Sequence, residues 1–198
     1  MPDETAQCVP VEELIYLLRA QRHDFLNHLQ VILGYLQLGK TNTAIDYVKT
    51  VSQEITEAGR LMQMPWPELA TVLLLKSRQA EENETNVEVH LGKNLERIGD
   101  NPEELVGIIG DIYDLICYQL GDCRAEERQV IVDVDEEDGA YVIKFSWPQG
   151  SNRPFDKFGL LAHPVMETAR QNFRRVELSD QEGKVWLSLY LPDGSAPR

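Results

Sequence analysis

One long stretch without proline dominates the start of this 198-residue chain. Within residues 11–38, apolar residues recur three, four or seven positions apart, as they do on one face of a helix. At about 100° per residue, this apolar stripe spans only about 60° of the helix surface. Its members are Leu14, Leu18, Phe25, Leu29, Ile32 and Leu36. So narrow a stripe is typical of helix pairs and bundles.

A second amphipathic segment, residues 45–62, follows closely on the first. Between them, Gly39-Lys40-Thr41-Asn42 is typical of a helix stop followed by a new N-cap. Two long helices joined by so short a loop are antiparallel neighbours. Because a lone hairpin cannot bury two apolar stripes, we expect two chains to pair as a homodimer whose hairpins form a four-helix bundle.

The sequence Met64-Pro65-Trp66-Pro67 interrupts the helical pattern and marks the predicted domain boundary. We therefore expect a helical domain over residues 1–64 and a second domain over residues 65–198. In the second domain the periodicity predicts helices over 68–82, 101–120 and 164–172, and strands over 86–91, 129–134, 140–147, 175–178 and 185–191. Helices segregated from strands in this way indicate an α+β sandwich, with one sheet covered by helices.

Charge and composition exclude several classes of protein. The net charge of −14 argues against nucleic acid and against an anionic membrane surface as partners. No apolar run is long enough to span a membrane, and no secretory signal is present. The three cysteines match no zinc site and are expected to be reduced thiols in a cytoplasmic protein. The acidic run before Gly139 lacks the glutamate that closes a calcium loop, so no metal site is predicted.

Two histidines of the first helix lie on different faces. With Leu14 at 0°, His23 falls at about 180° and Asn27 at about 220°, opposite the apolar stripe. His28 falls at about 320°, at the edge of the stripe, where a packing role is expected. The first helix therefore presents His23 to solvent.

An exposed histidine on a rigid helix can act as a nucleophile toward a phosphoryl group. A partner protein would then supply the rest of the active site. Asp24 can bond one ring nitrogen and fix the tautomer, while Asn27 lies one turn further along the same face. Arg22 can offset phosphate charge. By residue chemistry alone, His23 could equally be a surface histidine with no task.

The segment 18–39, with its Arg22-His23-Asp24-Phe25 core, Asn27 and the later Leu36-Gln37, resembles the phosphoacceptor helix of the sporulation-phosphotransferase-B-type group. That group includes the sporulation phosphotransferase and the citrate and dicarboxylate sensor kinases. The resemblance implies that His23 carries the phosphoryl group and that His28 does not.

Residues 67–192 resemble a histidine-kinase ATPase domain only in outline. Asp111 and Leu115 stand where the resemblance implies two asparagines, the second of which holds the magnesium of the nucleotide. Trp147 stands near the position of the adenine-reading aspartate, and Phe158-Gly159-Leu160 is a faint second glycine box. A leucine cannot coordinate magnesium, and the glycines of a phosphate cradle are missing. We therefore expect a degenerate domain that binds no ATP.

An intact phosphoacceptor helix on a degenerate ATPase-like domain resembles the organisation of the sporulation phosphotransferase. A chain that starts close to the hairpin, with no sensor segment ahead of it, fits this expectation. The resemblance implies a homodimer that moves phosphoryl groups between two response regulators, with no cofactor of its own and with Mg²⁺ held by the regulator. Two alternatives stay open: a soluble histidine kinase with a divergent ATP site, and a non-catalytic module that binds a response regulator.

Overall fold

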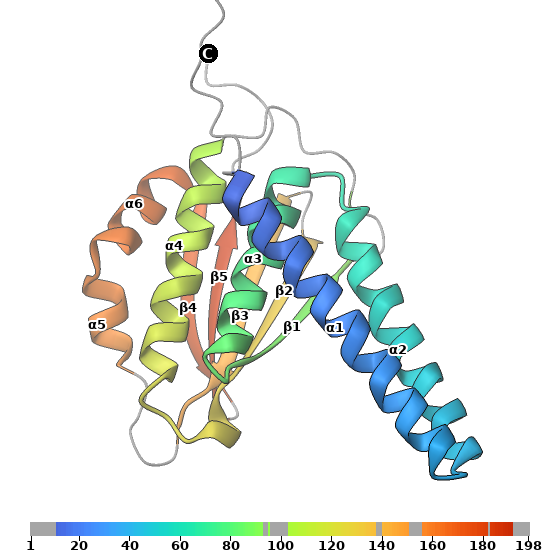
Figure 1. Cartoon of the computed structure of the whole chain (residues 1–198). Helices are drawn as coiled ribbons and strands as arrows, with labels where there is room; N and C mark the ends of the chain where they lie inside the picture. Colours follow the sequence, from blue (N-terminus) through green and yellow to red (C-terminus); the bar gives the residue numbers. More distant parts are fainter. Residues whose placement is uncertain are drawn as a thin grey trace, which may run out of the picture. The chain divides into compact units, whose positions relative to one another are not determined.

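The computed structural model describes residues 11–92, 95, 103–137, 140–150, 156–181 and 183–191. The chain forms two compact units, Met1–Gln63 and Met64–Arg198. The first is a helical hairpin and the second is a mixed sheet with helices on one face (Figure 1). The predicted α+β class is confirmed.

In the first unit, helix α1 (Val11–Gln37) runs antiparallel to helix α2 (Thr41–Met62). Gly39 ends α1 with a φ of 69°, which favours glycine. The amide of Lys40 donates to Tyr35 O at 2.9 Å, and the amide of Gly39 donates to Leu36 O at 3.0 Å. This is a Schellman motif, so the predicted helix stop is confirmed. The N-cap of α2 also lies in the predicted segment, at Lys40, whose side chain makes no capping hydrogen bond.

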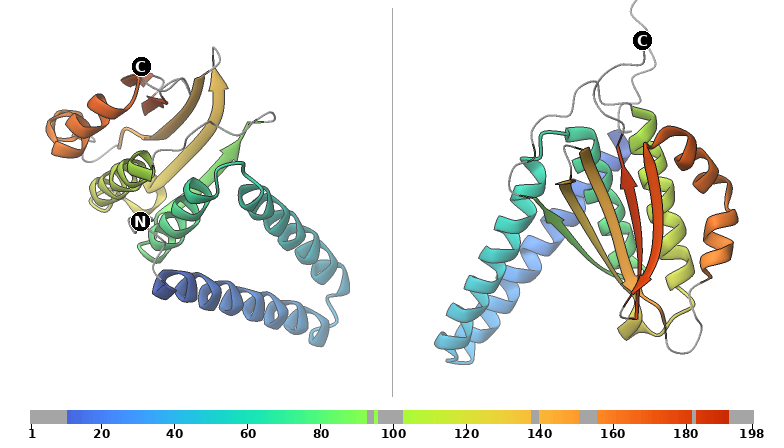
Figure 2. Two further views of the ribbon diagram at one scale, coloured as in Figure 1. Left: turned by 90° about the horizontal axis from the view of Figure 1, so that it is seen from above. Right: turned by 180° about the vertical axis from the view of Figure 1, so that it is seen from behind.

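The two helices of the hairpin meet near the turn and diverge toward their other ends (Figure 2). Near the turn, Tyr47 of α2 contacts both His28 and Tyr35 of α1. None of the α1 residues is buried, although Ala44, Val51 and Leu61 of α2 are. Much of the apolar surface of α1 is thus left uncovered by α2.

The second unit contains the following elements: α3 (Pro67–Glu82), β1 (Asn86–Leu91), α4 (Glu103–Leu120), the 3₁₀ turn η1 (Ala125–Glu127), β2 (Gln129–Glu137), β3 (Ala140–Pro148), α5 (Lys157–Ala162), α6 (Pro164–Asn172), β4 (Arg175–Gln181) and β5 (Lys184–Tyr190). The five strands form one sheet in the order β1-β2-β3-β5-β4. β1 is parallel to β2, and the other pairs are antiparallel. Helices α3, α4 and α6 lie over one face of this sheet, while the opposite face carries no helix among the described residues of this unit (Figure 2).

The core of the second unit lies between the sheet and these helices. Alternate residues of the central strands point into it, and they are fully buried: Val130, Val132, Val134, Ile143, Phe145, Trp147, Val185, Leu187 and Leu189. From the helices, Leu69 and Leu73 of α3 and Ile109, Ile112 and Ile116 of α4 are buried at helical spacing. The strand and helix periods seen in the sequence therefore meet in one core.

The observed elements differ from the predicted ones mainly at their ends. β2 and β4 each continue three residues beyond the predicted strands, to Glu137 and Gln181, because pairing with β3 and β5 persists past the last apolar residues. The six-residue helix α5 was not predicted, since one turn and a half shows no clear period. The predicted helix start at Asn101-Pro102 and the turn Asp138-Gly139 lie outside the described residues.

Arg128 holds the turn that follows α4. Its Nε donates to Cys123 O at 3.1 Å and its Nη2 donates to Gly121 O at 3.0 Å. Arg128→Ala is expected to lower the free energy of unfolding by about 1–3 kcal/mol, because two carbonyls lose charged donors. Urea unfolding of the chain measures this. The control Lys184→Ala removes the same charge from an exposed site and is expected to cost less than about 0.5 kcal/mol. Equal losses in the two variants would contradict the prediction.

Candidate functional site

His23 lies near the middle of α1 with 69% of its side chain exposed. Asn27, one turn further along the helix, is also exposed. Asp24 is half-buried. The helical periodicity thus places His23 and Asn27 on the exposed face, as the sequence predicts, with the imidazole pointing into solvent.

Both polar neighbours of His23 gather at the same ring nitrogen. Asn27 Nδ2 lies 3.2 Å from His23 Nδ1, and Asp24 Oδ1 lies 3.5 Å from it. An ionised carboxylate only accepts hydrogen bonds, so Asp24 favours a proton on Nδ1. Asn27 presents its donor Nδ2 to the ring and so favours a lone pair on Nδ1; it supports the Nδ1 proton only when its amide is turned so that the oxygen faces the ring. Nε2 then keeps its lone pair, and none of the described residues bonds it.

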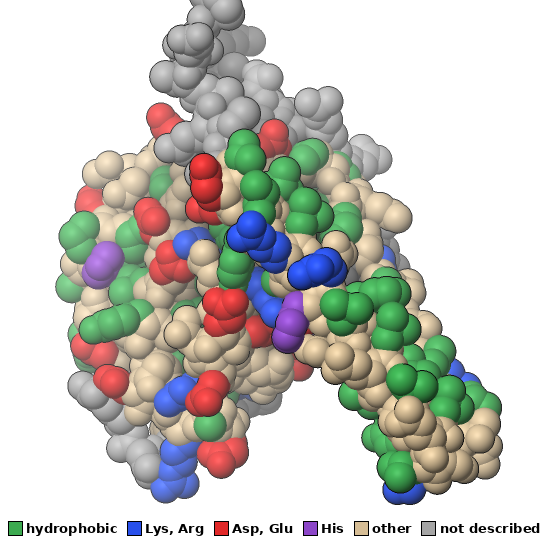
Figure 3. All heavy atoms as spheres, in the orientation of Figure 1, with side chains coloured by type: hydrophobic (Ala, Val, Ile, Leu, Met, Phe, Trp, Pro, Cys, Tyr) green, Lys and Arg blue, Asp and Glu red, His purple; other side chains and the backbone are tan. Residues whose placement is uncertain are grey.

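Arg22 is exposed beside His23. Within the described part of the chain it makes no ion pair, so its guanidinium is available to an incoming anion. Basic side chains gather with a histidine over α1, whereas acidic ones are spread over α4 (Figure 3). The structure thus brings Asp24 and Asn27 to the ring of His23 and leaves Arg22 beside it without a contact.

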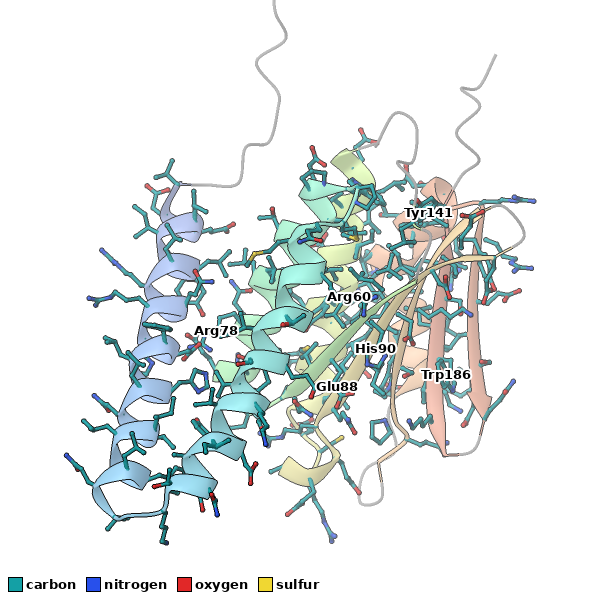
Figure 4. The ribbon with its side chains drawn as sticks, turned by 90° about the vertical axis from the view of Figure 1, so that its right-hand side faces the viewer. Arg60, Arg78, Glu88, His90, Tyr141 and Trp186 are labelled. Atoms are coloured by element: carbon teal, nitrogen blue, oxygen red, sulfur yellow. The ribbon has the colours of Figure 1, made fainter. Side chains whose placement is uncertain are left out.

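The ring nitrogens of the three other histidines make hydrogen bonds or ion pairs within the fold. His28 Nδ1 lies 3.0 Å from Tyr47 Oη, which ties α1 to α2. His90 projects from β1 next to Glu88 (Figure 4), with Asp133 Oδ1 3.0 Å from Nδ1 and Glu88 Oε2 3.7 Å from Nε2. His163 accepts a bond from Val165 N at 3.3 Å and caps α6. Carboxylates on both sides of His90 would repel a phosphoryl group.

Asp111 and Leu115, which the resemblance compares with the two asparagines of a kinase, lie in an open hollow between α4 and α6. This hollow has a volume of about 640 Å³. It is lined by Ile108, Asp111, Asp114, Leu115, Tyr118, His163, Pro164, Val165 and Thr168. Lys76 Nζ lies 2.5 Å from Asp114 Oδ2, whereas Asp111 has no ion pair with a described residue. The hollow therefore offers a carboxylate and a leucine where a nucleotide site needs asparagines.

The other predicted remnants of a nucleotide site also serve the fold. Trp147 is 1% exposed and belongs to the core. Asp156 Oδ1 accepts from Gly159 N at 2.9 Å, which caps α5. A Cβ on Gly159 would lie 2.3 Å from Asp156 Oδ2, so the glycine is required by this cap. Its amide is not free to bind a phosphate.

No group of three or more metal-ligating side chains occurs among the described residues. In the same part of the chain, no helix is long and apolar enough to cross a membrane. Tyr118 and His163, which border the hollow, were missed at the sequence level. An exposed tyrosine in an amphipathic helix and a histidine before a proline carry no signal of a cavity by themselves.

Cys117 of α4 is half-buried beside Asp114. Burial, and then the charge of Asp114, raise the pKa of this thiol from 9.0 to about 12. In the folded chain, the Cys117 thiol therefore keeps its proton at pH values at which the same thiol ionises in the unfolded chain. Stability contributed by this group is complete below pH 9 and is lost as the pH rises toward 12.

Because the thiolate is the reactive form, Cys117 is expected to resist alkylation at pH 8. Iodoacetamide should modify it at least about 100-fold more slowly in the native chain than in urea. Mass spectrometry of the peptide that contains Cys117 measures the two rates. Equal rates in the native and unfolded chain would contradict the raised pKa.

Residues 4–64, which include the hairpin that holds His23 outward, match the family model of the sensor kinase SpoOB-type, alpha-helical domain. The resemblance drawn from the Arg22-His23-Asp24 segment is thereby confirmed for the helical part of the chain.

Curated relatives carry names from the same group. A probable C4-dicarboxylate sensor kinase of Halalkalibacterium halodurans is 29% identical over 140 residues, and the alignment covers 68% of this chain and 26% of that protein. The sensor protein CitS of the same organism is 32% identical over 139 residues, with coverage of 64% and 24%. A probable C4-dicarboxylate sensor kinase of Bacillus subtilis is 22% identical over 137 residues, with coverage of 67% and 26%. The chain spans about a quarter of the length of these relatives.

Solved structures of histidine kinases are also similar to the chain. The Acinetobacter baumannii histidine kinase AdeS matches with a TM-score of 0.43 and 11% identity, over 85% of this chain and 96% of that one. The catalytic domain of histidine kinase ThkA matches with a TM-score of 0.44 and 9% identity, over 64% and 90%. With scores below 0.5, neither match carries weight beyond the topology described above.

Proposed function

We propose that the chain is a phosphorelay phosphotransferase that accepts a phosphoryl group on His23. The observation that carries this proposal is the exposed Nε2 of His23, with Asp24 and Asn27 both gathered at Nδ1. Residues 1–64 would serve as the phosphoacceptor and dimerisation domain, and residues 65–198 as a degenerate ATPase-like domain. The curated relatives are named as sensor kinases, which supports response regulators as partners.

In the first step, the lone pair of Nε2 attacks the phosphorus of a regulator's aspartyl phosphate. The bond between phosphorus and the carboxylate oxygen breaks, and the aspartate leaves as a carboxylate. In the second step, the aspartate of another regulator attacks the phosphohistidine, and the N–P bond breaks. Asp24 keeps the proton on Nδ1 throughout, while Arg22 balances charge on the phosphoryl oxygens. The regulator contributes Mg²⁺, so the main task of this chain is alignment.

The test is labelling of the chain by a response regulator carrying ³²P on its aspartate, without ATP. We expect the label to move onto the chain and then onto a second, unlabelled regulator. A stable complex of chain and regulator without any transfer would overturn the proposal and favour a non-catalytic binding module.

A histidine kinase with a divergent ATP site is the second candidate, because the curated relatives are named as sensor kinases. Against it stand Asp111 in the hollow, whose uncompensated carboxylate would repel a triphosphate, and the amide of Gly159, which already donates to Asp156. Isothermal titration calorimetry with MgATP is expected to show no binding at millimolar nucleotide. Saturable, magnesium-dependent binding would favour the kinase.

The uncovered stripe of α1 supports the homodimer. Leu14, Leu18, Phe25, Leu29 and Leu36 are all exposed, and Ile32 alone is half-buried. α2 adds exposed Ile45, Val48, Ile55 and Met62. A continuous apolar surface of this kind marks a protein interface. A second hairpin would cover it and complete the four-helix bundle.

A further inference from the structure

The hollow between α4 and α6 has the features of a docking groove and not only of a lost nucleotide site. Its floor is apolar, formed by the buried side chains of Ile108 and Val165 and the half-buried Leu115. It belongs to the second unit, whereas His23 belongs to the first, and its role does not depend on phosphotransfer. The helices α4 and α6 lie side by side and form its walls (Figure 1).

The charges in the hollow are uneven. Asp114 is neutralised by Lys76, at 2.5 Å from its carboxylate. Asp111 lies one turn earlier, is exposed, and has no ion pair or hydrogen bond with a described residue. One uncompensated carboxylate beside an apolar floor is complementary to a partner segment that carries a lysine or arginine next to apolar side chains.

Tyr118 supplies the second anchor. This residue lines the hollow and is 83% exposed, so its ring is available to pack against an incoming side chain. Asp111 and Tyr118 are seven residues apart, so they stand about 10 Å apart along the same side of α4. A helix laid along the groove can present a cation to Asp111 and an aliphatic side chain to Tyr118 two turns later.

We propose that the α4–α6 hollow binds a basic amphipathic helix of a partner protein, with Asp111 and Tyr118 as its anchors. The cation of the helix pairs with Asp111, its apolar face covers Leu115 and Val165, and Tyr118 closes over its end. This binding mode is helix-in-groove recognition, with specificity from the single uncompensated charge.

The probe is a fluorescein-labelled peptide of about 15 residues, with leucines at helical spacing and lysines on the flanks. Fluorescence polarisation with the whole chain, at about 0.15 M salt to screen distant charges, is expected to show saturable 1:1 binding. A matched peptide with glutamates in place of the lysines should not bind.

Matched variants locate the binding. Asp111→Asn is expected to weaken binding at least about fivefold, and Tyr118→Ala at least about tenfold. Glu126→Gln makes the same change in net charge at an exposed position outside the hollow, and should weaken binding less than about twofold. Both anchors are exposed, so the variants should keep the native circular dichroism spectrum.

Three results would overturn the proposal. No saturable binding of the lysine peptide excludes the groove. Equal weakening by Asp111→Asn and Glu126→Gln shows attraction to the acidic chain as a whole. Displacement of the peptide by MgATP assigns the hollow to a nucleotide. The phosphotransfer assay is unaffected by each of these results, so the two proposals fail separately.

Discussion

His23→Gln is expected to reduce labelling by a phosphorylated response regulator at least about 1,000-fold, to the background of the assay. Glutamine keeps a polar side chain of similar length on the same exposed face, but its amide has no lone pair able to hold a phosphoryl group. Because His23 is 69% exposed, its replacement should leave the hairpin folded. The measurement is transfer of ³²P in the absence of ATP.

Two variants on the same helix sharpen this test. His28→Gln removes the contact with Tyr47 but no nucleophile, so labelling should stay within about threefold of the wild type. Asp24→Asn should slow labelling by about 10- to 100-fold without abolishing it, because an amide no longer selects the Nδ1 proton. Labelling that survives in His23→Gln and disappears in His28→Gln would show that His28, and not His23, carries the phosphoryl group.

Leu18→Glu combined with Leu29→Glu is expected to convert the proposed homodimer into a monomer. Both leucines are exposed on the hairpin, at 56% and 47%, so neither is needed for contact with α2. In a two-fold symmetric dimer the double variant places four carboxylates where four leucines would be buried. The dissociation constant should rise at least about 1,000-fold. Sedimentation velocity over a range of concentrations measures this change.

A matched pair tests whether position matters more than charge. Gln30 and Gln37 lie at about 160° and 140° from Leu14, away from the stripe, and both are exposed. Gln30→Glu combined with Gln37→Glu adds the same charge and should change the dissociation constant less than about threefold. A wild-type chain that sediments as a monomer at every concentration would refute the interface itself.

The sequence predicted those parts of the fold whose periodicity is undisturbed. The stop at Gly39 was predictable because a glycine with positive φ ends a helix in a recognisable way, and β2 was predictable because its valines alternate. The cap of α2 was not, since Thr41 and Asn42 are both capping residues and only the backbone shows that Lys40 precedes the first turn.

The candidate site also has features that local sequence predicts and features that it does not. The outward direction of His23 follows from turns of a single helix, so the sequence alone was sufficient. The meeting of Asn27 with Nδ1 depends on side-chain rotamers, whereas helical periodicity places Asn27 only on the same face as His23. The hollow depends on how closely α6 approaches α4, which is a tertiary distance that no local pattern encodes.

The cap made by Asp156 on Gly159 limits how this chain can change over generations. Replacing Asp156 would free the amide, but it would also leave the first turn of α5 without its cap, while the carboxylates of Asp111 and Asp114 remained in the hollow. Replacing either carboxylate alone would leave the amide occupied. Replacing Asp156 therefore weakens a local structure, whereas replacing Asp111, which has no ion pair with a described residue, leaves this cap in place. Under the proposed function, a phosphate-binding site in the second unit would therefore take more than one substitution.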